Sequence, residues 1–450
     1  MAGEEWFECT VDDIKAAAPN ALSTGPFGSA ISSRYFVDDG VPVIRGSNLS
    51  QDVGVRLSDE GLVFLSDEKA REFSRSVARR GDLVFTCWGT IDQVGLVDDR
   101  CRYSAYIVSN KQMKLTPDSG RVSSQFLYYL FSSPLMRERI LNQGIGSSVP
   151  GFNLGQLRSI GLILPPLPEQ RAIAHILGTL DDKIELNRRM NETLEAMARA
   201  LFKSWFVDFD PVRAKAEGRD PGLPHPLANL FPASFEDSEL GEIPKGWQVR
   251  KLRDLSNYLS RGVGPAYVDD GGIAVLNQKC IRDRRVNFLR ARRHDEHKRS
   301  VDGRMLRLLD VVVNSTGVGT LGRIAQIWDL PERAIADSHV TVIRAANAVD
   351  PWFLGMALTG RESEVESLGE GSTGQTELSR ERLGSLACLT PPCKLQVAFG
   401  HQASKLLMRI SANEKMSSTL ATLRDTLLPK LISGELRVTQ AETALSGALL

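Results

Sequence analysis

The sequence predicts an α+β fold with two similar compact regions of mixed strands and helices, which we call the bodies. Each body is followed by one long helix, and the two helices pair as an intramolecular coiled coil. Three observations predict this arrangement. The chain contains an internal repeat, each copy of the repeat ends in a stretch with coiled-coil periodicity, and a segment rich in Pro, Gly and acidic residues separates the copies. With 450 residues the chain is long enough for two or three domains.

Composition excludes several classes of protein. The 55 Lys and Arg residues balance the 55 Asp and Glu residues, so the chain is neither a disordered polyelectrolyte nor a uniformly basic nucleic-acid coat. Its six cysteines include no CxxC pair, which argues against a zinc ribbon or a disulfide framework. The N-terminal residues are acidic, and no apolar run approaches the ~18 residues of a membrane span. We expect a cytoplasmic protein that does not enter a membrane.

The repeat is clearest where each body passes into its helix. Residues of the first copy match identical residues of the second at one constant offset, without a gap. The matched residues are Pro165, Pro166, Gln170, His175, Leu180, Ile184, Asn187, Met190, Thr193, Leu194 and Leu201 in the first copy, and Pro391, Pro392, Gln396, His401, Leu406, Ile410, Asn413, Met416, Thr419, Leu420 and Leu427 in the second.

Upstream of the helices, each copy carries short β-branched and aromatic runs punctuated by Gly, which are typical of a mixed body. We expect a domain boundary in the Pro- and Gly-rich segment Val207–Gly246. The expected segments are a first body at 1–164, a helix at 165–206, a linker at 207–246, a second body at 247–390, a helix at 391–433 and a tail at 434–450.

The long helices have the most regular pattern. Pro168, followed by Glu169 and Gln170, is typical of the first turn of a helix. Seam residues then recur at steps of four and three as far as Trp205, which is the period of a coiled coil. A helix from Pro168 to Phe206 is roughly 58 Å long at about 1.5 Å per residue. The second copy repeats the seam, so the two seams can bury each other.

An asparagine lies at the middle of each seam, Asn187 in the first and Asn413 in the second. A polar residue in a seam lowers stability but fixes the register when its partner is also polar. We expect an antiparallel pair in which the two asparagines meet near a pseudo-two-fold axis. Two alternatives stay open: the asparagines face solvent at helix bends, or the helices run parallel. Cysteines at Ile173 and Leu427 would crosslink antiparallel helices, and cysteines at Ile173 and Phe399 would crosslink parallel ones.

Recognisable catalytic motifs are absent from the sequence, which has neither a Gly-Lys phosphate loop nor an Asn-Pro-Pro-Tyr tetrapeptide. Gly317–Gly322 has the spacing G-x-G-x-x-G, but Arg323–Trp328 alternates like a strand where a dinucleotide site needs a helix. We interpret the charged run His294–His297 as a solvated face, and His175 and His401 as helix-packing residues. The sequence therefore predicts no catalytic residue and no metal site.

Basic residues concentrate between Arg282 and Arg307, where ten Lys or Arg residues stand against four Asp or Glu residues. Val207–Gly246 balances this excess with eight acidic against four basic residues. Arginines supply phosphate contacts and, as bidentate donors, recognise guanine in a major groove. Taken alone, the run is as typical of a solvated surface as of a DNA-binding face.

Six motifs lie between Gly25 and Leu436. They are Gly25-Pro-Phe-Gly-Ser29, Val41-Pro-Val-Ile44, Gly81-Asp-Leu-Val84, Leu164-Pro-Pro-Leu-Pro-Glu-Gln170, Leu201-Phe-Lys-Ser-Trp-Phe-Val-Asp-Phe-Asp-Pro-Val212 and Leu427-Leu-Pro-Lys-Leu-Ile-Ser-Gly-Glu-Leu436. This set resembles the specificity subunit of type I restriction-modification enzymes. The resemblance implies two pseudo-symmetric target-recognition domains separated by two long antiparallel helices, which form an intramolecular coiled coil and act as a ruler.

The same resemblance implies the partners. Each domain would read one half of a bipartite, asymmetric site on double-stranded DNA. Two methyltransferase subunits with S-adenosylmethionine, and two restriction subunits with ATP and Mg²⁺, would carry the chemistry, because this chain lacks the pocket and cofactor site that base flipping needs. No cofactor is expected in this chain. Two departures stand out: Pro391-Pro-Cys-Lys-Leu-Gln396 replaces the Pro-Leu-Pro-Glu-Gln pattern of the first half, and Arg424 on the second seam suggests the edge of a partner interface.

Polar residues in the turns of the two bodies are the candidates for base contacts. They are Arg45, Asn48, Trp88, Thr90 and Gln93 in the first body, and Asn277, Gln278, Lys279, Arg282, Asn314, Thr316 and Arg323 in the second. The family pattern does not fix these positions individually.

Two other functions compete with DNA recognition. The first is a two-lobed coiled-coil scaffold that binds proteins, and the second is a self-contained restriction enzyme, which the missing cofactor and nuclease motifs disfavour. Affinity for duplex DNA that stays flat as salt rises would exclude phosphate contacts and favour the scaffold.

Overall fold

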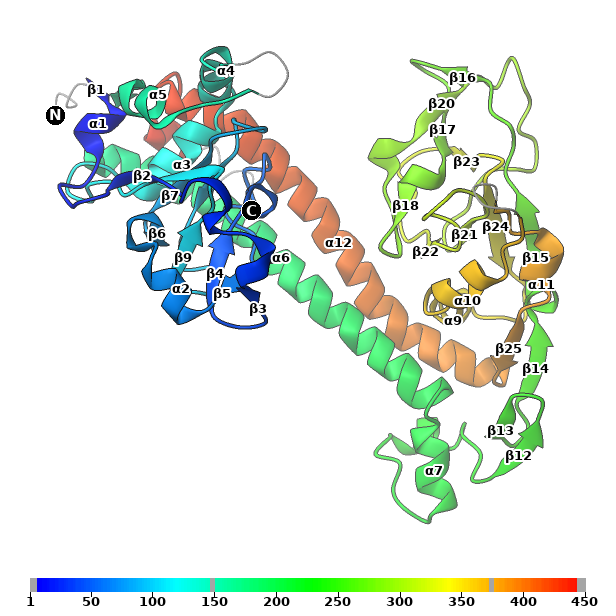
Figure 1. Ribbon diagram of the computed structural model, residues 1–450. Coiled ribbons are helices and arrows are strands. Elements are labelled where there is room, and N and C mark those ends of the chain that lie inside the picture. Colours follow the sequence, from blue (N-terminus) through cyan, green and yellow to red (C-terminus); the bar gives the residue numbers. More distant parts are fainter. Residues whose placement is uncertain (1–5, 146–149, 372–375, 443–450) are drawn as a thin grey trace. The chain divides into compact units, whose positions relative to one another are not determined.

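In the computed structural model, which describes residues 6–145, 150–371 and 376–442, the chain forms two compact units. Unit 1 consists of the described residues of Met1–Asn187 and Lys415–Leu450, and unit 2 consists of those of Arg188–Glu414. The boundary between the units therefore falls inside both long helices. Each unit contains one mixed body together with part of each helix (Figure 1).

Unit 1 builds its body from two main sheets, ordered β2-β10-β7-β8 and β3-β5-β4-β9-β6, and a two-stranded pair of β1 with β11. Its strands are β1 (Phe7–Thr10), β2 (Leu22–Thr24), β3 (Phe36–Val37), β4 (Val41–Ile44), β5 (Val63–Leu65), β6 (Val77–Arg79), β7 (Leu83–Thr86), β8 (Val94–Leu96), β9 (Ala105–Val108), β10 (Gln112–Leu115) and β11 (Gly161–Leu164). Its shorter helices are α1 (Val11–Ile14), α2 (Asp67–Arg71), α3 (Ser124–Ser132), α4 (Pro134–Asn142) and α5 (Leu154–Ser159).

Unit 2 has main sheets ordered β15-β24-β21-β22 and β16-β20-β17-β23, and strand pairs β14-β25, β12-β13 and β18-β19. Its strands are β12 (Phe235–Ser238), β13 (Gly241–Pro244), β14 (Gln248–Lys251), β15 (Ser256–Arg261), β16 (Tyr267–Val268), β17 (Ile273–Leu276), β18 (Ile281–Arg282), β19 (Arg285–Val286), β20 (Arg292–His294), β21 (Val311–Asn314), β22 (Ile324–Gln326), β23 (Ala334–Ala336), β24 (Val340–Ala345) and β25 (Ala387–Thr390). Its shorter helices are α7 (Asp210–Ala216), α8 (His225–Ala228), α9 (Pro351–Thr359), α10 (Glu362–Ser367) and α11 (Arg380–Gly384).

The two bodies repeat one topology. In each, an early strand pairs antiparallel with the strand that precedes the long helix, β1 with β11 and β14 with β25. In each, one strand pair is parallel, β4 with β9 and β17 with β23. The strand β22 follows the glycine-rich turn Gly317–Gly322 directly, so this turn is the strand connection predicted and no helix begins there. The internal repeat therefore encodes a repeated fold, although the bodies share few residues.

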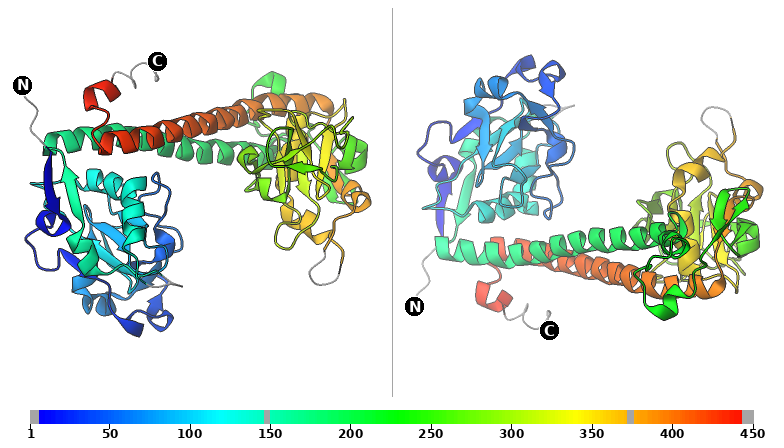
Figure 2. Two further views of the ribbon diagram at one scale, coloured as in Figure 1. Left: turned by 90° about the horizontal axis from the view of Figure 1, so that it is seen from above. Right: turned by 90° about the horizontal axis from the view of Figure 1, so that it is seen from below.

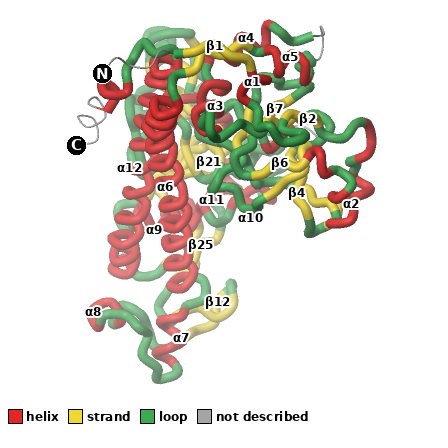
Figure 3. Tube along the Cα trace, turned by 90° about the vertical axis from the view of Figure 1, so that its left-hand side faces the viewer, coloured by secondary structure: helices red, strands yellow, loops and turns green. Residues whose placement is uncertain are grey.

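Both predicted long helices are present, α6 over Leu167–Phe206 and α12 over Cys393–Ile432. In unit 1, the parts of α6 and α12 lie side by side and share one apolar core with α3 (Figures 2 and 3). In unit 2, Trp205 of α6 packs edge-on against Phe399 of α12, with 6.0 Å between the ring centroids. A double proline, Pro391-Pro392, precedes α12, as Pro165-Pro166 precedes α6.

Cross-helix contacts fix the direction of the pairing within each unit. In unit 1, Asp181 of α6 contacts Arg424 of α12, and further along α6 the amide of Asn187 donates to Ser417 Oγ at 3.2 Å. Residue numbers thus rise along one helix as they fall along the other, so the parts of α6 and α12 in this unit are antiparallel.

A glutamine at the start of each long helix ties it to its body. Gln170 Oε1 accepts from the backbone N–H of Ser123 at 3.0 Å, and Gln396 Oε1 accepts from the backbone N–H of Asp350 at 3.1 Å. Ser123 and Asp350 are the N-caps of α3 and α9. Because both glutamines are buried, these bonds set the position of the helix start against the body.

The segment Val207–Gly246 differs from an extended linker. It contains α7, α8 and the β12–β13 hairpin (Figures 1 and 3). Val212, Phe231 and Ile243 are buried in the main core of unit 2. Its apolar residues pack beside Trp205, and the centroid of the Phe231 ring lies 5.2 Å from that of Trp205. Burial of these side chains makes the segment part of unit 2, despite its high content of Pro, Gly and acidic residues.

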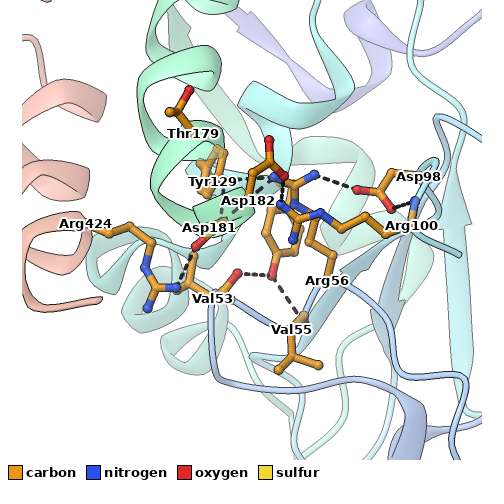
Figure 4. Close-up of polar contacts among 12 residues, drawn as sticks. Val53, Val55, Arg56, Asp98, Arg100, Tyr129, Thr179, Asp181, Asp182 and Arg424 are labelled. Carbon is orange, nitrogen blue, oxygen red and sulfur yellow. Dashed lines mark hydrogen bonds and ion pairs between the residues drawn. The ribbon is translucent and has the colours of Figure 1, made fainter. Parts of the chain in front are cut away.

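A buried polar network joins the first body to both long helices (Figure 4). Arg56 donates to Asp98 at 2.6 Å and to the Tyr129 hydroxyl at 3.1 Å. Tyr129 in turn donates to Asp181 of α6 at 2.5 Å, and Arg424 of α12 donates to the same carboxylate at 2.7 Å. Arg424 is 4% exposed, so the expectation that it marks the edge of a partner interface is wrong: its charge is neutralised inside unit 1.

Candidate nucleic-acid interface

Strand ends converge at one place in each body. In unit 1, β4 and β7 end at this place and the β9–β10 turn joins them; we call Arg45–Asn48, Thr86–Gln93 and Ser109–Lys111 the first strand-end site. In unit 2, β17, β21 and the β23–β24 turn are arranged in the same way. The second strand-end site comprises Asn277–Cys280, Asn314–Arg323 and Asp337–His339.

Matching backbone hydrogen bonds show that the two sites share one frame. The N–H of Ser109 donates to Ile44 at 3.0 Å, and that of Asp337 donates to Leu276 at 2.9 Å. One residue after β7 and β21 the pattern repeats. The N–H of Cys87 donates to Lys111 at 2.7 Å, and that of Ser315 donates to His339 at 2.8 Å. The frame therefore presents side chains from equivalent positions, whichever residues occupy them.

The first strand-end site forms a cavity of about 500 Å³, and it brings together four of the five residues predicted for this body, Arg45, Trp88, Thr90 and Gln93. The Trp88 side chain is 55% exposed. Its ring lies against Gly151, where an added Cβ would come within 2.6 Å of the ring. An exposed aromatic face that lines a cavity can stack on a base or pack against a sugar.

Two of these side chains are already partly bonded. Arg45 donates from Nη2 to the carbonyl of Gly61 at 2.9 Å, while its Nε is buried without a hydrogen-bond partner among the described residues. Gln93 donates to the carbonyl of Leu49 at 3.2 Å and accepts from the Thr86 hydroxyl at 3.3 Å. These bonds orient the two side chains, so less conformational entropy is lost when a ligand binds.

The prediction that Asn48 contacts a base is wrong. It is fully buried, its Oδ1 accepts from the N–H of Arg45, and its amide donates to the carbonyls of Ser58 and Glu60, each at 3.0 Å. All of these bonds hold the loop that surrounds Arg45. Asn48 therefore shapes the site and does not reach a ligand.

The second strand-end site is held by a chain of side-chain bonds. Gln278 donates to the carbonyl of Thr316 and to its hydroxyl, and the hydroxyl lies 2.8 Å from His339 Nδ1. Asn314 is fully buried and donates to the carbonyl of Gln278 at 3.2 Å. The prediction that Asn314 contacts a base is therefore also wrong, because a fully buried side chain cannot reach one. Thr316 stays half-buried at the mouth of the site.

The other residues predicted in unit 2 lie on three different features. Asn277 caps the 3₁₀ turn that carries exposed Lys279, accepting from the Lys279 N–H at 2.9 Å. Arg323, half-buried before β22, donates to the carbonyl of Gly319 at 2.8 Å. Arg282 lies on the β18–β19 hairpin, opposite Arg285, and its side chain is 69% exposed. The hairpin contacts the long helices through Arg285, so Arg282 is on a different feature from Gln278 and Thr316.

The basic run from Arg282 to Arg307 is not a single face. Several of its residues bind groups within unit 2: Arg284 and Arg285 pair with Glu195, Arg293 with Glu332, Arg299 with the carbonyl of Gly264, and Arg304 with Ser260. His294, expected on a solvated face, is fully buried and accepts at Nδ1 from the N–H of Ala266 at 2.9 Å. Much of the positive charge in this run is therefore neutralised or directed inward.

The two seam asparagines are each 1% exposed, so the alternative that they face solvent is wrong. Asn187 donates to Ser417 in unit 1, and Asn413 donates to Asn191 Oδ1 at 2.8 Å in unit 2. Ser417 and Asn191 lie one helical turn beyond Asn413 and Asn187, so the two bonds are equivalent under the repeat. His175 and His401, expected to pack between helices, are exposed instead.

Two cysteines of the first body, Cys87 and Cys101, are buried free thiols. Burial raises the pKa of Cys87, which belongs to the first strand-end site, to about 12, and burial likewise raises that of Cys101 to about 11. Both thiols are thus protonated at neutral pH and are poor nucleophiles. Across the described ranges, no three His, Cys, Asp or Glu side chains gather as metal ligands. Across the same ranges, every helix is too short or too polar to span a bilayer.

Lys111 and His339 were missed from the sequence. Lys111 lines the first cavity beside Trp88, and His339 closes the bond chain of the second site. Each lies in a short polar turn, Ser109–Lys111 or Asp337–His339, between two buried strands. Alignment of these two turns as copies of one repeat would have revealed both residues.

Comparisons with known proteins agree with this architecture. A model of the family described as "Type I restriction modification DNA specificity domain" matches residues 39–196. The "Type I restriction enzyme HindI specificity subunit" of Haemophilus influenzae is 24% identical over 381 residues, which cover 74% of this chain and 81% of that protein. The MjaIX specificity subunit of Methanocaldococcus jannaschii is 25% identical over 385 residues, covering 83% and 82%. The crystal structure of the S subunit of a type I system from M. genitalium has a similar fold, with a TM-score of 0.61, 15% identity and 96% of each chain covered.

Proposed function

Because this chain belongs to the family of type I restriction-modification specificity subunits, we propose that it recognises DNA sequence for a complex whose reactions are carried out by other subunits. Each body would read one half of a bipartite, asymmetric site. The observation that carries this proposal is the matched frame of the two strand-end sites, which holds different side chains at equivalent positions.

The difference between the two sites supports an asymmetric target. Counted from the shared backbone bonds, Trp88 and Gln93 of the first site correspond to Thr316 and Arg323 of the second. Glutamine pairs bidentately with adenine and arginine with guanine in a major groove. Two recognition sites that share one backbone frame but carry different hydrogen-bonding side chains would select different half-sites.

Within the proposed interface, the side chains divide by role. Those offering fixed donors or an aromatic face would contact bases, and exposed cations would contact phosphates. The proposed contact set is Arg45, Trp88, Thr90, Gln93 and Lys111 in unit 1, and Asn277, Gln278, Lys279, Arg282, Thr316, Arg323 and His339 in unit 2. Asn48 and Asn314 support the turns from below.

The long helices are proposed to act as the spacer. A helix of 40 residues is about 60 Å long at 1.5 Å per residue, whereas one turn of B-DNA is about 34–36 Å. An intramolecular antiparallel coiled coil of α6 and α12 would separate the two target-recognition domains, proposed at 1–164 and 247–390, by a fixed length. The bonds of Asn187 and Asn413 would set its register, as buried polar pairs do in coiled coils.

The partners follow from the family and from the repeat. We propose that two methyltransferase subunits, carrying S-adenosylmethionine, bind the repeated helices and their flanking turns. Two restriction subunits with ATP and Mg²⁺ would complete the assembly. DNA recognition is favoured over the protein scaffold because the relatives are specificity subunits along most of this chain's length.

The direct test is to purify the chain with its methyltransferase partner and to select bound duplexes from a randomised library. We expect a split motif, in which two specified half-sites flank a spacer of constant length and free sequence. Affinity for the selected duplex should fall steeply with salt, because each phosphate contact releases counterions. A continuous motif, or log affinity that is flat in log salt, would contradict the proposal.

A further inference from the structure

Unit 2 contains an apolar pocket of about 460 Å³ where its body meets α6 and α12. Phe202, Trp328, Met356, Leu389 and Leu407 supply its apolar walls, and basic side chains from α6 and the β18–β19 hairpin stand at its rim. Small-molecule sites have this size and this combination of an apolar wall with a few polar groups.

The repeat shows what occupies the same place in unit 1. The helices α3 and α9 begin alike, because Ser123 Oγ accepts from the N–H of Phe126 and Asp350 Oδ1 accepts from that of Phe353. Three residues on, Met356 takes the place of Tyr129. The long helices, aligned at their matched buried glutamines, place Leu407 where unit 1 has Asp181.

The two junctions are therefore chemically unlike. Unit 1 fills the place with the Tyr129 phenol and the Asp181 carboxylate, which bind each other and two arginines (Figure 4). Unit 2 has Met356 and Leu407 instead, and these two side chains line the open pocket. Relative to unit 1, unit 2 lacks one aromatic ring and one carboxylate at this place.

Cations at the rim are incompletely neutralised. A single carboxylate, that of Glu195, faces three guanidinium groups: Arg199 at 2.6 Å, Arg285 at 2.9 Å and Arg284 at 3.7 Å. Glu414 adds a second carboxylate at 3.0 Å from Arg285 Nε. Three positive charges thus share two negative ones.

Arg285 also keeps one donor unused. Its Nη1 is buried without a hydrogen-bond partner among the described residues, and its guanidinium lies over the Trp328 ring at 4.3 Å from the centroid. A buried donor without an acceptor is costly, and a carboxylate is the acceptor that a guanidinium prefers. An anion carrying an aromatic ring would balance the excess positive charge of Arg199, Arg284 and Arg285 and pack its ring against the apolar wall.

We propose that this pocket binds a small aromatic carboxylate, with its ring between Phe202, Trp328 and Met356 and its carboxylate on Arg285. The bound molecule would supply the ring and the carboxylate that Tyr129 and Asp181 supply in unit 1. It would also link α6, α9 and the β18–β19 hairpin, so that binding stabilises unit 2. This proposal does not depend on the recognition of DNA.

The test uses the full chain without DNA and two fluorescent probes. One is 8-anilinonaphthalene-1-sulfonate, an aromatic anion, and the other is N-phenyl-1-naphthylamine, its neutral analogue. We expect the anion to bind in a 1:1 ratio with about tenfold higher affinity than the neutral probe, because one charge-assisted bond is gained. We also expect 4-hydroxyphenylacetate, which carries the missing phenol and carboxylate, to displace the anion competitively.

Two variants separate the ring from the charge. Arg285→Met should abolish the preference for the anionic probe while the neutral probe still binds. Met356→Tyr introduces the residue that unit 1 has at the matching position. It should lower the affinity for both probes by about tenfold, because the added ring fills the pocket. Arg171→Ala is the matched control, because Arg171 is exposed on α6 and does not line the pocket. This change should leave the affinity for both probes unaltered. Urea unfolding checks that each variant folds, and Ala357→Trp replaces Met356→Tyr if the latter does not.

Three results would overturn the proposal: no saturable 1:1 binding of the anionic probe, the same anion preference in Arg285→Met as in the wild type, or displacement of the probe by the methyltransferase partner but not by 4-hydroxyphenylacetate. The last result would assign the pocket to a protein segment. Because no DNA is present, each of these outcomes leaves the proposed DNA recognition untouched.

Discussion

At the scale of single residues, burial separates the polar side chains of the strand-end sites into two groups. Asn48 and Asn314 are fully buried and bind neighbouring backbone, so they shape the turns. Gln93 and Arg323 occupy equivalent positions before β8 and β22, are half-buried, and each donates one bond to a nearby carbonyl. Their remaining donors and acceptors are the ones that can recognise a base edge.

This equivalence gives a paired prediction. Gln93→Ala should relax one position of one half-site, and Arg323→Ala should relax one position of the other half-site. Each change should cost about 1–3 kcal/mol of binding free energy at the affected base pair. Library selection and titration with single-base variants measure both effects.

The matched control for this pair is Lys279→Ala, which removes an exposed cation from the same site as Arg323. Loss of this cation should weaken binding to DNA of every sequence by the same factor. It should also lower the slope of log affinity against log salt concentration by about one, as expected for a phosphate contact. If Gln93→Ala and Arg323→Ala behave like Lys279→Ala, the strand-end sites do not read sequence.

The buried network of unit 1 gives a second prediction at this scale. Arg424→Ala removes one partner of Asp181 and leaves a buried carboxylate incompletely neutralised, so unfolding of unit 1 should become easier by about 3–5 kcal/mol. The triple change Tyr129→Met, Asp181→Leu and Arg424→Ala installs the residues that the repeat places in unit 2. It should recover much of the loss, because Asp181 and Arg424 are removed together and Arg56 keeps its pairing with Asp98, so no buried charge is left unpaired. Urea unfolding followed by circular dichroism measures both, and a triple variant less stable than the single one would contradict the argument.

The sequence indicated the turns that carry the sites, because polar residues follow apolar runs at both copies. It did not indicate which polar residue is buried. Asn48 is covered by residues around Ser58 and Glu60, and such contacts between separate loops leave no local pattern. Lys111 and His339 were missed for the same reason, because they join the sites through a turn that is distant in sequence from Arg45 and Asn277.

At the scale of elements, the long helices were the easiest part to predict and the strands the hardest. Helix periodicity repeats over many turns, and proline pairs precede both helices, so α6 was predicted to within one residue of its start. The strands are short, and several, such as β7 and β21, are buried along their whole length. Short buried runs show no alternation, so their pairing became clear only through the sheets.

Helix register yields the third prediction. Asp181 faces Arg424 and Asn187 faces Ser417, so the pairing places Leu177 opposite Leu427 within unit 1. Leu177→Cys with Leu427→Cys should form an internal disulfide on mild oxidation, in a background carrying Cys393→Ser to remove the exposed native thiol. Counting free thiols by mass after alkylation measures the yield. This pair lies one turn from the pair Ile173 and Leu427 expected from the sequence alone.

The control pair for the opposite orientation is Ile173→Cys with Phe399→Cys, which would be close only if the two helices ran parallel. It should stay reduced under the same conditions. Efficient oxidation of this pair, together with failure of the first, would reverse the assignment of helix direction.

At the scale of the whole molecule, the two compact units do not follow the boundaries that composition suggests. Unit 2 is one continuous stretch, Arg188–Glu414, whereas unit 1 is assembled from both ends of the chain. The Pro- and Gly-rich segment lies inside unit 2, and the cuts fall in the middle of α6 and α12. Amino-acid composition identifies segments that are typical of the protein surface. A compact unit, in contrast, is defined by the hydrophobic core that its residues share.

The core of unit 2 therefore predicts which fragment folds. Phe206 of α6 packs against Phe353 of α9 and Phe399 of α12, with 5.1 Å between ring centroids in both pairs. A fragment spanning 188–414 keeps all three rings and should unfold in one cooperative transition, with a free energy of unfolding of about 5–15 kcal/mol. A fragment spanning 247–390, cut where the sequence places the body, loses Phe206 and Phe399 and exposes the face of α9. It should be less stable by several kcal/mol, because each large buried aromatic residue contributes about 3–5 kcal/mol. Urea unfolding of the two fragments, measured side by side, decides between the boundaries: equal stability would show that the body is independent of the helices, and that the helices are a separate spacer after all.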